Sequence, residues 1–398
     1  MGRKPTLQIG GVLILLFWTI TAFVNHVGLL CFAAVLGGYG VGATFVVLPL
    51  YLSEVSDSRV RGSNCSLFFL MFSAGILYGS FMHQYFKKTA ACLLSLPIPI
   101  AFLFIINCSW TPESPYFLVA KEKFAEARRV LLDLGMKEEG KYVATDDLIE
   151  FDNVTVHFHR GHDPCRHMFR IKENRNALFT QAIIFMVQVS SSYVPILFTS
   201  MNIFIRVTGD MRPAPAENLY SAIQLFGSIF CFLVIDSYDR KPLLLTSCFI
   251  VIAGQICLGL CYYFDSEGIH HVHSWVFVFV TSFFIMGYSI GLGPIPWILM
   301  AETFGPHIRS LAASGLVLMV SIFLLSIPRV FLQIAKHLGV YMACWIFSAV
   351  VSLGASCIFF LFVETRHKTI HSMANDMEEE MLYCGEDPRR SQLRLIES

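Results

Sequence analysis

Residues 287–309 read GYSIGLGPIPWILMAETFGPHIR, and this stretch decides the fold. It is apolar enough to belong to a membrane-crossing helix, but Pro294 and Pro296 interrupt it two residues apart. Proline frees backbone groups that lipid cannot satisfy, so such a break is expected to line a cavity inside the protein. Glu302 and Arg309 follow, seven residues apart, where one apolar span ends and the next begins. The stretch therefore predicts a broken transmembrane helix with a charged pair at one end.

The composition of the whole chain agrees with a membrane location. Of its 398 residues, 55% are hydrophobic and 15% are charged, whereas soluble domains carry about 25% charged residues. Lys and Arg together equal Asp and Glu, at 29 each, which argues against a nucleic-acid partner. The 12 cysteines include no CxxC pair, so neither a disulfide scaffold nor a zinc site is expected. The sequence thus predicts an integral membrane protein whose partner is the lipid bilayer.

Ten stretches approach the roughly 20 apolar residues that a crossing helix needs. We therefore expect an all-α, polytopic membrane protein with about ten transmembrane helices. Four spans fall in residues 1–110 and six in 176–363, separated by a polar linker at 111–175 and followed by a polar tail at 364–398. The ten predicted spans are 7–25, 27–53, 64–86, 89–110, 176–204, 216–236, 241–264, 273–301, 310–334 and 340–363.

The distribution of basic residues predicts the orientation of the chain. With the long linker set aside, the segments on the side of the N-terminus carry 12 Lys and Arg, and those on the other side carry 6. Basic residues favour the cytoplasmic side of a membrane. Both termini are therefore expected to be cytoplasmic, most naturally at the plasma membrane.

A pattern recurs on the two sides of the linker. Glu54 and Arg61 have the same spacing as Glu302 and Arg309, which lie 248 residues further along. Further matches keep the same order at similar offsets: Arg3-Lys4-Pro5 with Arg240-Lys241-Pro242, Gly38 and Gly42 with Gly287 and Gly291, and Glu113-Ser114 with Glu364-Thr365. Duplicated helical bundles are typical of secondary transporters, whose substrate site lies between the halves near the midplane. Because two spans precede Arg240 in the second half and none precedes Arg3, we expect two helices to be absent relative to the repeat.

The repeated charges are candidates for a gate. A Glu at a helix C-terminus and an Arg at a helix N-terminus both oppose the helix dipole, so partners are expected. Exposed ion pairs contribute about 0–1 kcal/mol each, which suits a gate that opens easily. The alternative is that they are ordinary charges at span ends. The predicted network, closing the cytoplasmic side, comprises Glu54, Arg61, Glu113, Asp236, Arg240, Glu302, Arg309 and Glu364.

Three polar or amphipathic side chains inside spans are candidates for substrate binding. Gln188 and Gln224 are amides within apolar helices, where an amide needs a partner; hydrogen bonding between helices is the equal alternative. Trp297, beside the proline break, could stack on a flat ligand or fill a packing gap. The glycines of both halves are expected to permit close helix packing.

No catalytic motif or cofactor site is present in the sequence, so an enzyme is not expected. A dense tract in the linker raises the question of a metal, but its spacing fits no standard site and a polar surface loop is expected instead. The tract consists of His157, His159, His162, Cys165 and His167.

These motifs together resemble the sugar porter family of the major facilitator superfamily. Residues 38–62 resemble its fourth-helix signature, 112–118 the PESPR-type motif after the sixth helix, and 236–242 the loop after the eighth. Residues 293–309 resemble the tenth-helix signature, and 363–365 the PET motif. The sequence of residues 49–62 is most similar to that of facilitative trehalose transporters. The resemblance covers the whole chain and implies the twelve-helix fold with pseudo-repeated halves, here beginning at the third helix.

The departures from the family pattern fall where relatives contact sugar. The fifth-helix Gln of the family is matched by Phe69, the second Gln of the seventh-helix pair by Val189, and the Asn that follows by Val194. The eleventh-helix Asn-Trp is matched by Val320-Ser321, and a fourth-helix Arg of the cytoplasmic network by Ala34. Gln188 and Trp297 remain.

The resemblance implies facilitative uniport of a hexose or a disaccharide such as trehalose by alternating access. Uniport is favoured over symport because no first helix is present to carry a proton-coupling acid. The alternative is a non-transporting or truncated paralogue that acts as a sensor or partner. No cofactor is implied.

Overall fold

The computed structural model describes residues 2–56, 60–85, 97–119, 121, 123–134, 137–138, 141–142, 168–169, 172–197, 214–266 and 274–362. Within these residues, nine helices are long and apolar enough to cross a membrane. A further apolar helix of 14 residues covers part of the span predicted at 89–110. The prediction of an all-α membrane protein with about ten crossing helices is confirmed.

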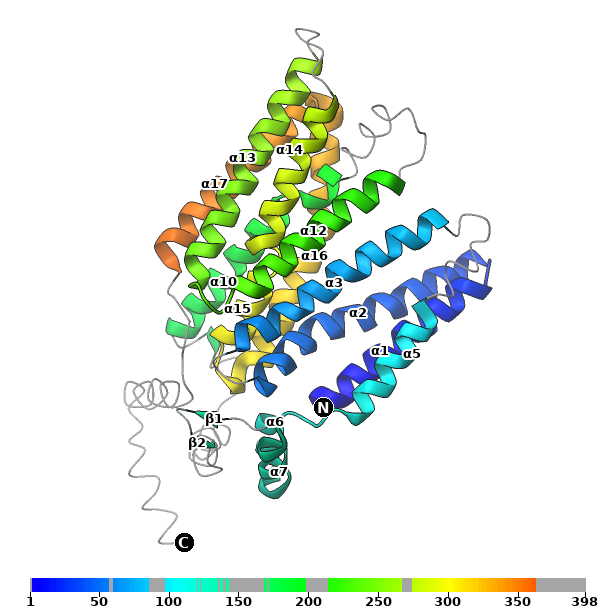
Figure 1. Cartoon of the computed structure of the whole chain (residues 1–398), viewed down its shortest axis with the longest axis vertical. Helices are drawn as coiled ribbons and strands as arrows, with labels where there is room; N and C mark the ends of the chain where they lie inside the picture. The colour runs from blue at the N-terminus through cyan, green and yellow to red at the C-terminus, as the bar shows by residue number, and fades with distance from the viewer. Residues whose placement is uncertain are drawn as a thin grey trace.

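The first group of helices packs side by side (Figure 1). In it, α1 lies against α2 and α5, and α2 lies against α3. Its members are α1 (Arg3–Phe23), α2 (Val27–Val55), α3 (Arg61–Tyr85) and α5 (Pro97–Trp110).

Short elements follow the first group at the end of the molecule where α1 begins, which we call the N-terminal end (Figure 1). The small helices α6 (Pro115–Val119) and α7 (Phe124–Leu134) pack through buried apolar side chains. The strands β1 (Lys137–Glu138) and β2 (Lys141–Tyr142) pair antiparallel, with Lys137 opposite Tyr142.

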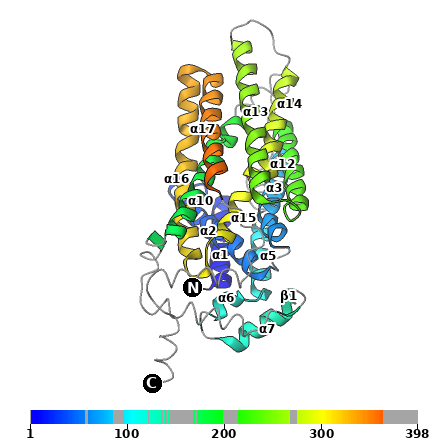
Figure 2. The same cartoon turned by 90° about the vertical axis from the view of Figure 1, so that its left-hand side faces the viewer.

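The second group contains the remaining long helices. They are α10 (Lys172–Ser190), α12 (Ala214–Val234), α13 (Arg240–Ser266), α14 (Ser274–Gly287), the π-turn η1 (Tyr288–Leu292), α15 (Ile295–Thr303), α16 (Pro306–Leu338) and α17 (Val340–Leu361). The groups meet where α3 runs along α12 and where α2 contacts α15 and α16, as the two views show (Figures 1 and 2). We call the end opposite the N-terminal end the far end.

The helix that contains the two prolines is broken, as predicted. Helix α14 gives way to η1, whose closing hydrogen bond runs from the Gly293 N–H to the Tyr288 carbonyl at 2.8 Å, and α15 then begins. Ser247 of α13 secures the turn. Its hydroxyl donates to the Gly287 carbonyl and accepts from the Leu292 N–H, both at 2.7 Å.

The predicted glycine contacts are only partly correct. A Cβ atom at Gly287 or Gly291 would overlap side chains of α13, and one at Gly40 would approach the backbone of α1. These glycines permit close packing. A Cβ atom at Gly38 or Gly42, in contrast, would meet no atom of another element within 4 Å among the described residues, so the packing role predicted for them is wrong.

Candidate functional site

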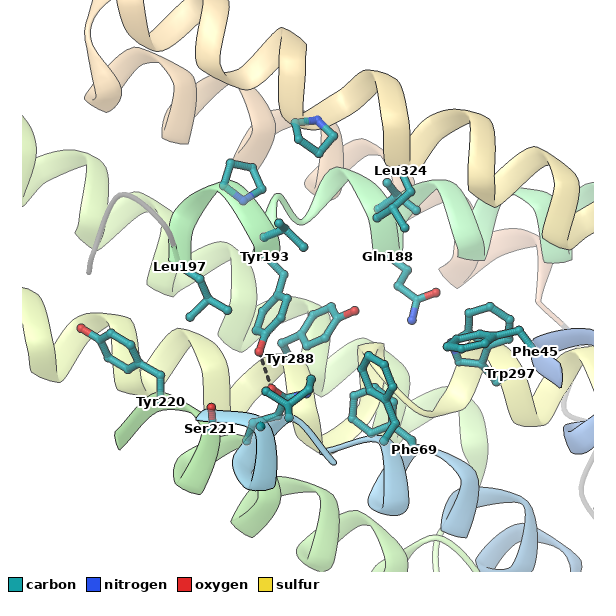
Figure 3. Close-up of a pocket in the computed structure, with 18 of the residues that line it drawn as sticks. Phe45, Phe69, Gln188, Tyr193, Leu197, Tyr220, Ser221, Tyr288, Trp297 and Leu324 are labelled. Atoms are coloured by element: carbon teal, nitrogen blue, oxygen red, sulfur yellow. Dashed lines mark hydrogen bonds between the residues drawn. The ribbon is translucent and has the colours of Figure 1, made fainter. Parts of the chain in front are cut away.

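A cavity of about 650 Å³ lies between the two helix groups. Its wall combines α2 and α3 with α10, α12, η1, α15 and α16 (Figure 3). Ser80, Glu217 and Pro328 line it on turns near the far end, whereas Phe68 and Trp297 line it nearest the N-terminal end. The cavity therefore extends from the middle of the bundle toward the far end, and we call its inner part, around Phe68 and Trp297, the floor.

Gln188 borders the cavity and also holds the broken helix. Its Nε2 donates to the Gly293 carbonyl at 2.8 Å, while its Oε1 makes no hydrogen bond of normal geometry with a described residue. Tyr288 lies beside it (Figure 3). About two turns earlier on α10, Gln181 donates to the Pro296 carbonyl at 2.7 Å. Both of the predicted alternatives for Gln188, cavity lining and helix–helix bonding, are thus present.

Gln224 lines the cavity within a chain of hydrogen bonds that joins both groups. Its Oε1 accepts from the Tyr193 hydroxyl at 2.5 Å, and its Nε2 donates to Ser73 Oγ at 3.4 Å. Ser73 in turn lies 2.8 Å from the Ser228 hydroxyl. Each of its two polar atoms therefore has a partner within the protein, while the amide keeps a second N–H and a second lone pair for further hydrogen bonds.

Trp297 lies on the floor within a cluster of aromatic rings. It makes edge-on contacts with Phe45, Phe68 and Phe185, at centroid distances of 5.1, 5.9 and 5.0 Å. The residue is 8% exposed. It therefore fills a packing gap and lines the cavity at once.

The positions at which this sequence departs from the sugar-porter pattern lie on the same wall. Phe69, Val189, Val194 and Val320 all line the cavity. Phe69 rests on the broken helix so closely that a Cβ atom at Gly293 would overlap its ring. Apolar side chains therefore stand where the resemblance places polar sugar contacts.

Sequence reasoning missed a pair of tyrosines at the centre of the wall. Tyr193 and Tyr288 stack with ring centroids 4.4 Å apart and planes 11° from parallel (Figure 3). Tyr288 lies in the quoted 287–309 stretch, beside the proline break, and that position was the available signal. Tyr193 lies five residues after Gln188, just beyond the end of α10 at Ser190, and no sequence feature indicated that the helix ends there.

The charged residues predicted for a gate gather at the N-terminal end in two clusters. In the first, Glu54 pairs with Arg3 at 3.0 Å and with Arg309 of the second group at 3.9 Å. Glu113 Oε1 accepts from the backbone N–H groups of Arg3 and Lys4 at 2.9 and 3.1 Å, and so caps α1. Arg3 and Lys4 were noted in the repeat but not included in the predicted network.

The second cluster surrounds Arg240. Its Nη2 lies 3.3 Å from Glu302 and 3.8 Å from Asp236. Asp236 also accepts hydrogen bonds from the backbone N–H and the hydroxyl of Ser63, in the first turn of α3. The pairing of Arg3 with Glu54 is thereby repeated by Arg240 with Glu302, as the internal match of the two RKP segments suggests.

The structure corrects two expectations about the gate, and a third concerns a residue outside the described part of the chain. Arg61 makes no ion pair within 4 Å with a described residue, although its charge attracts Glu302. Ala34 cannot mark a lost gate arginine: it lies twenty residues before Glu54 on α2, about 30 Å away along the helix. Glu364 lies outside the described residues.

The ion pairs are also buried, contrary to the expectation of exposed pairs. Glu54 is 1% exposed, Arg309 6%, Arg240 4% and Glu302 7%. Removing one partner of a buried pair costs about 3–5 kcal/mol, because it leaves the other charge without compensation. Loss of one partner is therefore expected to disturb the N-terminal end more than loss of a partner from a surface pair would.

The histidine-rich tract of the linker, His157, His159, His162, Cys165 and His167, lies outside the described residues. Within the described part of the chain, no group of three or more metal-binding side chains occurs.

Membrane-length helices that enclose a cavity between two groups, with buried ion pairs at one end, define a membrane carrier of the major facilitator type. Residues 1–377 match the family model described as "Sugar (and other) transporter". The chain belongs to this family, whose members are transporters and not enzymes.

Individual relatives agree with the family assignment. The chain is 25% identical over 402 residues to the facilitated trehalose transporter Tret1 of Culex quinquefasciatus, covering 100% of this chain and 75% of that one. It is 26% identical to the galactose-proton symporter of Escherichia coli K12, covering 95% and 80%. The proton:xylose symporter XylE, solved with 6-bromo-6-deoxy-D-glucose, has a TM-score of 0.80 at 19% identity, covering 94% of this chain and 83% of XylE.

Proposed function

We propose that this multi-pass membrane protein is a facilitative uniporter that moves a sugar-class substrate by alternating access. The substrate expected from the sequence is a hexose or a disaccharide such as trehalose. The observation that carries the proposal is a cavity between two helix groups with buried ion pairs at its N-terminal end and, among the described residues, none at the far end. A carrier needs such an arrangement, because opening one end must accompany closing the other.

The assignment of these charged residues to a gate rests on the helices that they connect. Arg309 of α16 reaches Glu54 of α2, and Asp236, just after α12, reaches Ser63 of α3. Each contact crosses between the two groups, so these contacts are lost when the groups separate at this end. We place this end in the cytoplasm of a plasma-membrane protein, as the distribution of basic residues favours.

Uniport is supported by the charges around the cavity. Among the described residues, Glu217 is the one carboxylate on the cavity wall, and it lies near the far end. The described floor and middle offer no acidic side chain that a coupling proton would neutralise during transport.

The proposal is tested by uptake into proteoliposomes that contain the full chain. Radiolabelled glucose and trehalose should enter faster than into protein-free liposomes, and unlabelled substrate inside should accelerate entry. A pH gradient should change the final accumulation by less than about twofold. Accumulation driven by the gradient would show symport, and entry no faster than in protein-free liposomes would refute transport of these sugars.

A second candidate is a protein that binds ligand without transporting it. The internal bonds of Gln224 favour it, because a sugar hydroxyl would have to share this amide with Tyr193 and Ser73. Saturable binding to the purified protein without uptake would support this candidate over the carrier.

A further inference from the structure

Most of the amide and serine side chains on the cavity wall are paired with the protein itself, whereas the Tyr220 hydroxyl, also on the wall, makes no hydrogen bond of normal geometry with a described residue. Beyond the two amides described above, the Ser221 hydroxyl donates to the Glu217 carbonyl at 2.6 Å, and the Ser80 hydroxyl to the Leu77 carbonyl at 2.9 Å. Gln188 Oε1 is the amide oxygen left for a ligand donor. A free hexose carries five hydroxyl groups, and each one that enters an apolar site without a partner is unfavourable.

The polar side chains on the cavity wall are distributed unevenly along it. Ser80, Glu217 and Ser221 lie toward the far end. The floor is formed by Phe45, Phe68, Phe69 and Trp297, together with aliphatic side chains such as Val189 and Val320 (Figure 3). A ligand that fits both regions has an apolar, flat end and a hydroxylated end.

We infer that the substrate class is a neutral aryl glycoside, with its aromatic ring on the floor and its sugar toward the far end. Aromatic rings pack favourably edge-on and offset against one another, which the floor geometry allows. The sugar would lie beside Gln188 and Tyr288, where Oε1 accepts one hydroxyl, and its outer hydroxyls would face Ser221, Glu217 and water. This inference rests on the proposed carrier function and narrows its substrate.

The size of the cavity is consistent with this class. Its volume of about 650 Å³ lies within the roughly 300–1,000 Å³ of pockets that hold drug-sized ligands. A hexose alone is smaller than such ligands and would leave the apolar floor uncovered. The added ring buries apolar surface that a free sugar does not have.

The test compares two glucosides that differ only in the aglycone. The purified full chain in nanodiscs is titrated with phenyl β-D-glucoside and with methyl β-D-glucoside, and saturable binding is measured by calorimetry. Saturation separates binding to the protein from partition of the phenyl compound into lipid. The phenyl compound is expected to bind at least about tenfold more tightly, because only it covers the floor.

Two substitutions of Phe69, a residue of the floor, test whether the phenyl ring of the ligand binds there. Phe69→Leu keeps the wall apolar and should retain most of the phenyl preference. Phe69→Gln introduces an amide and should reduce the preference to about threefold or less while strengthening binding of methyl β-D-glucoside. Both variants shorten a buried side chain and lower stability, so their binding is compared at a temperature at which melting curves show each of them folded.

The outcomes separate the substrate class from transport. Equal binding of the two glucosides, an unchanged preference in Phe69→Gln, or no binding of either compound overturns the inference, and uptake of free hexose would then still support the carrier. Phenyl preference with the expected response of the two variants supports the inference. If this pattern is found but radiolabelled phenyl β-D-glucoside does not enter proteoliposomes, the substrate class stands as a ligand class and the carrier function is overturned.

Discussion

Two glutamines on α10 hold the same broken backbone, but only one of them borders the cavity. Gln181 bonds the Pro296 carbonyl and Gln188 the Gly293 carbonyl, at 2.7 and 2.8 Å. Both side chains are buried, at 2% and 6% exposure. The pair therefore separates what a buried amide contributes to stability from what it contributes to ligand binding.

We predict that Gln181→Leu and Gln188→Leu both lower the melting temperature, because each removes a buried hydrogen bond to the broken helix. The cost is about 1–3 kcal/mol for Gln188→Leu, which leaves the Gly293 carbonyl unpaired, and about 0.5–1.5 kcal/mol for Gln181→Leu, because the Pro296 carbonyl keeps its bond within α15. Only Gln188→Leu should also weaken binding of the transported compound, by about tenfold, since it removes the free Oε1 from the cavity. Melting in detergent and ligand titration at a temperature where both variants are folded check this. Equal loss of binding in the two variants would show that Gln188 acts through the fold alone.

Some residues of the cavity and the gate could be recognised from the sequence, and others could not. Gln188, Gln224 and Trp297 were identified because a polar or bulky side chain stands out within an apolar span. Tyr193 and Tyr288 were not, because a tyrosine among apolar residues does not show which ring it will stack on. The partners of Glu54 were equally hidden: the repeated spacing placed it in a charged network without assigning partners, and the structure pairs it with Arg3 and Arg309.

At the scale of elements, the break between α14 and α15 shapes the cavity wall. Two prolines made the break predictable, since neither can continue the hydrogen bonding of a helix. The π-turn and its attachment to Ser247 were not predictable, because they depend on α13 lying alongside. The turn carries Tyr288, so its position sets one side of the cavity.

We predict that Ser247→Ala destabilises this turn, because it removes the hydroxyl that ties the Gly287 carbonyl and the Leu292 N–H to α13. Each of the two hydrogen bonds contributes about 0.5–1.5 kcal/mol. Ser289→Ala is the matched control in the turn itself. The Ser289 hydroxyl bonds the Ile285 carbonyl of its own helix at 2.8 Å, so its loss should cost less than about 1 kcal/mol.

The measurement is the melting temperature of both variants together with their ligand affinity. Ser247→Ala should lower both, although Ser247 does not line the cavity, because Tyr288 is no longer held in place. If the two serine variants melt at the same temperature, the turn does not depend on α13.

At the scale of the whole molecule, the buried clusters hold the two groups together at the N-terminal end. We predict that Arg309→Ala opens this end, since Glu54 then keeps only Arg3 and the link to α16 is lost. A native reporter is available in Cys65, which is 2% exposed and lies within the field of Glu302, Arg240 and Arg309. Its labelling by a membrane-impermeant thiol reagent, applied from the N-terminal side, should become at least about tenfold faster.

The control for this experiment is Lys123→Ala, at the same end of the molecule. Lys123 pairs with Glu126 at 3.0 Å, but both side chains are 56% exposed, so the pair contributes little. Cys65 labelling, located by mass spectrometry, should be unchanged in this variant and absent in Cys65→Ser. An unchanged rate in Arg309→Ala would refute the gate assignment.

The sequence by itself determined the membrane class, the helical fold and the position of the break. These properties follow from local features, namely long apolar spans and prolines, whose consequences do not depend on distant residues. The motifs also sufficed to indicate the sugar porter family, and the family match confirms it. The charges of the gate could be identified from their repeat, but not their pairing.

Only the tertiary structure decided which charges meet and what the cavity offers a ligand. Arg309 reaches Glu54 across 255 positions of sequence, and Gln224 is used by Tyr193 and Ser73. Burial and hydrogen bonding depend on which helices lie side by side, and composition cannot specify that. The opening stretch, 287–309, predicted a cavity beside Trp297. That the cavity has an aromatic floor and few free polar groups follows from how α2, α3 and α10 pack around it.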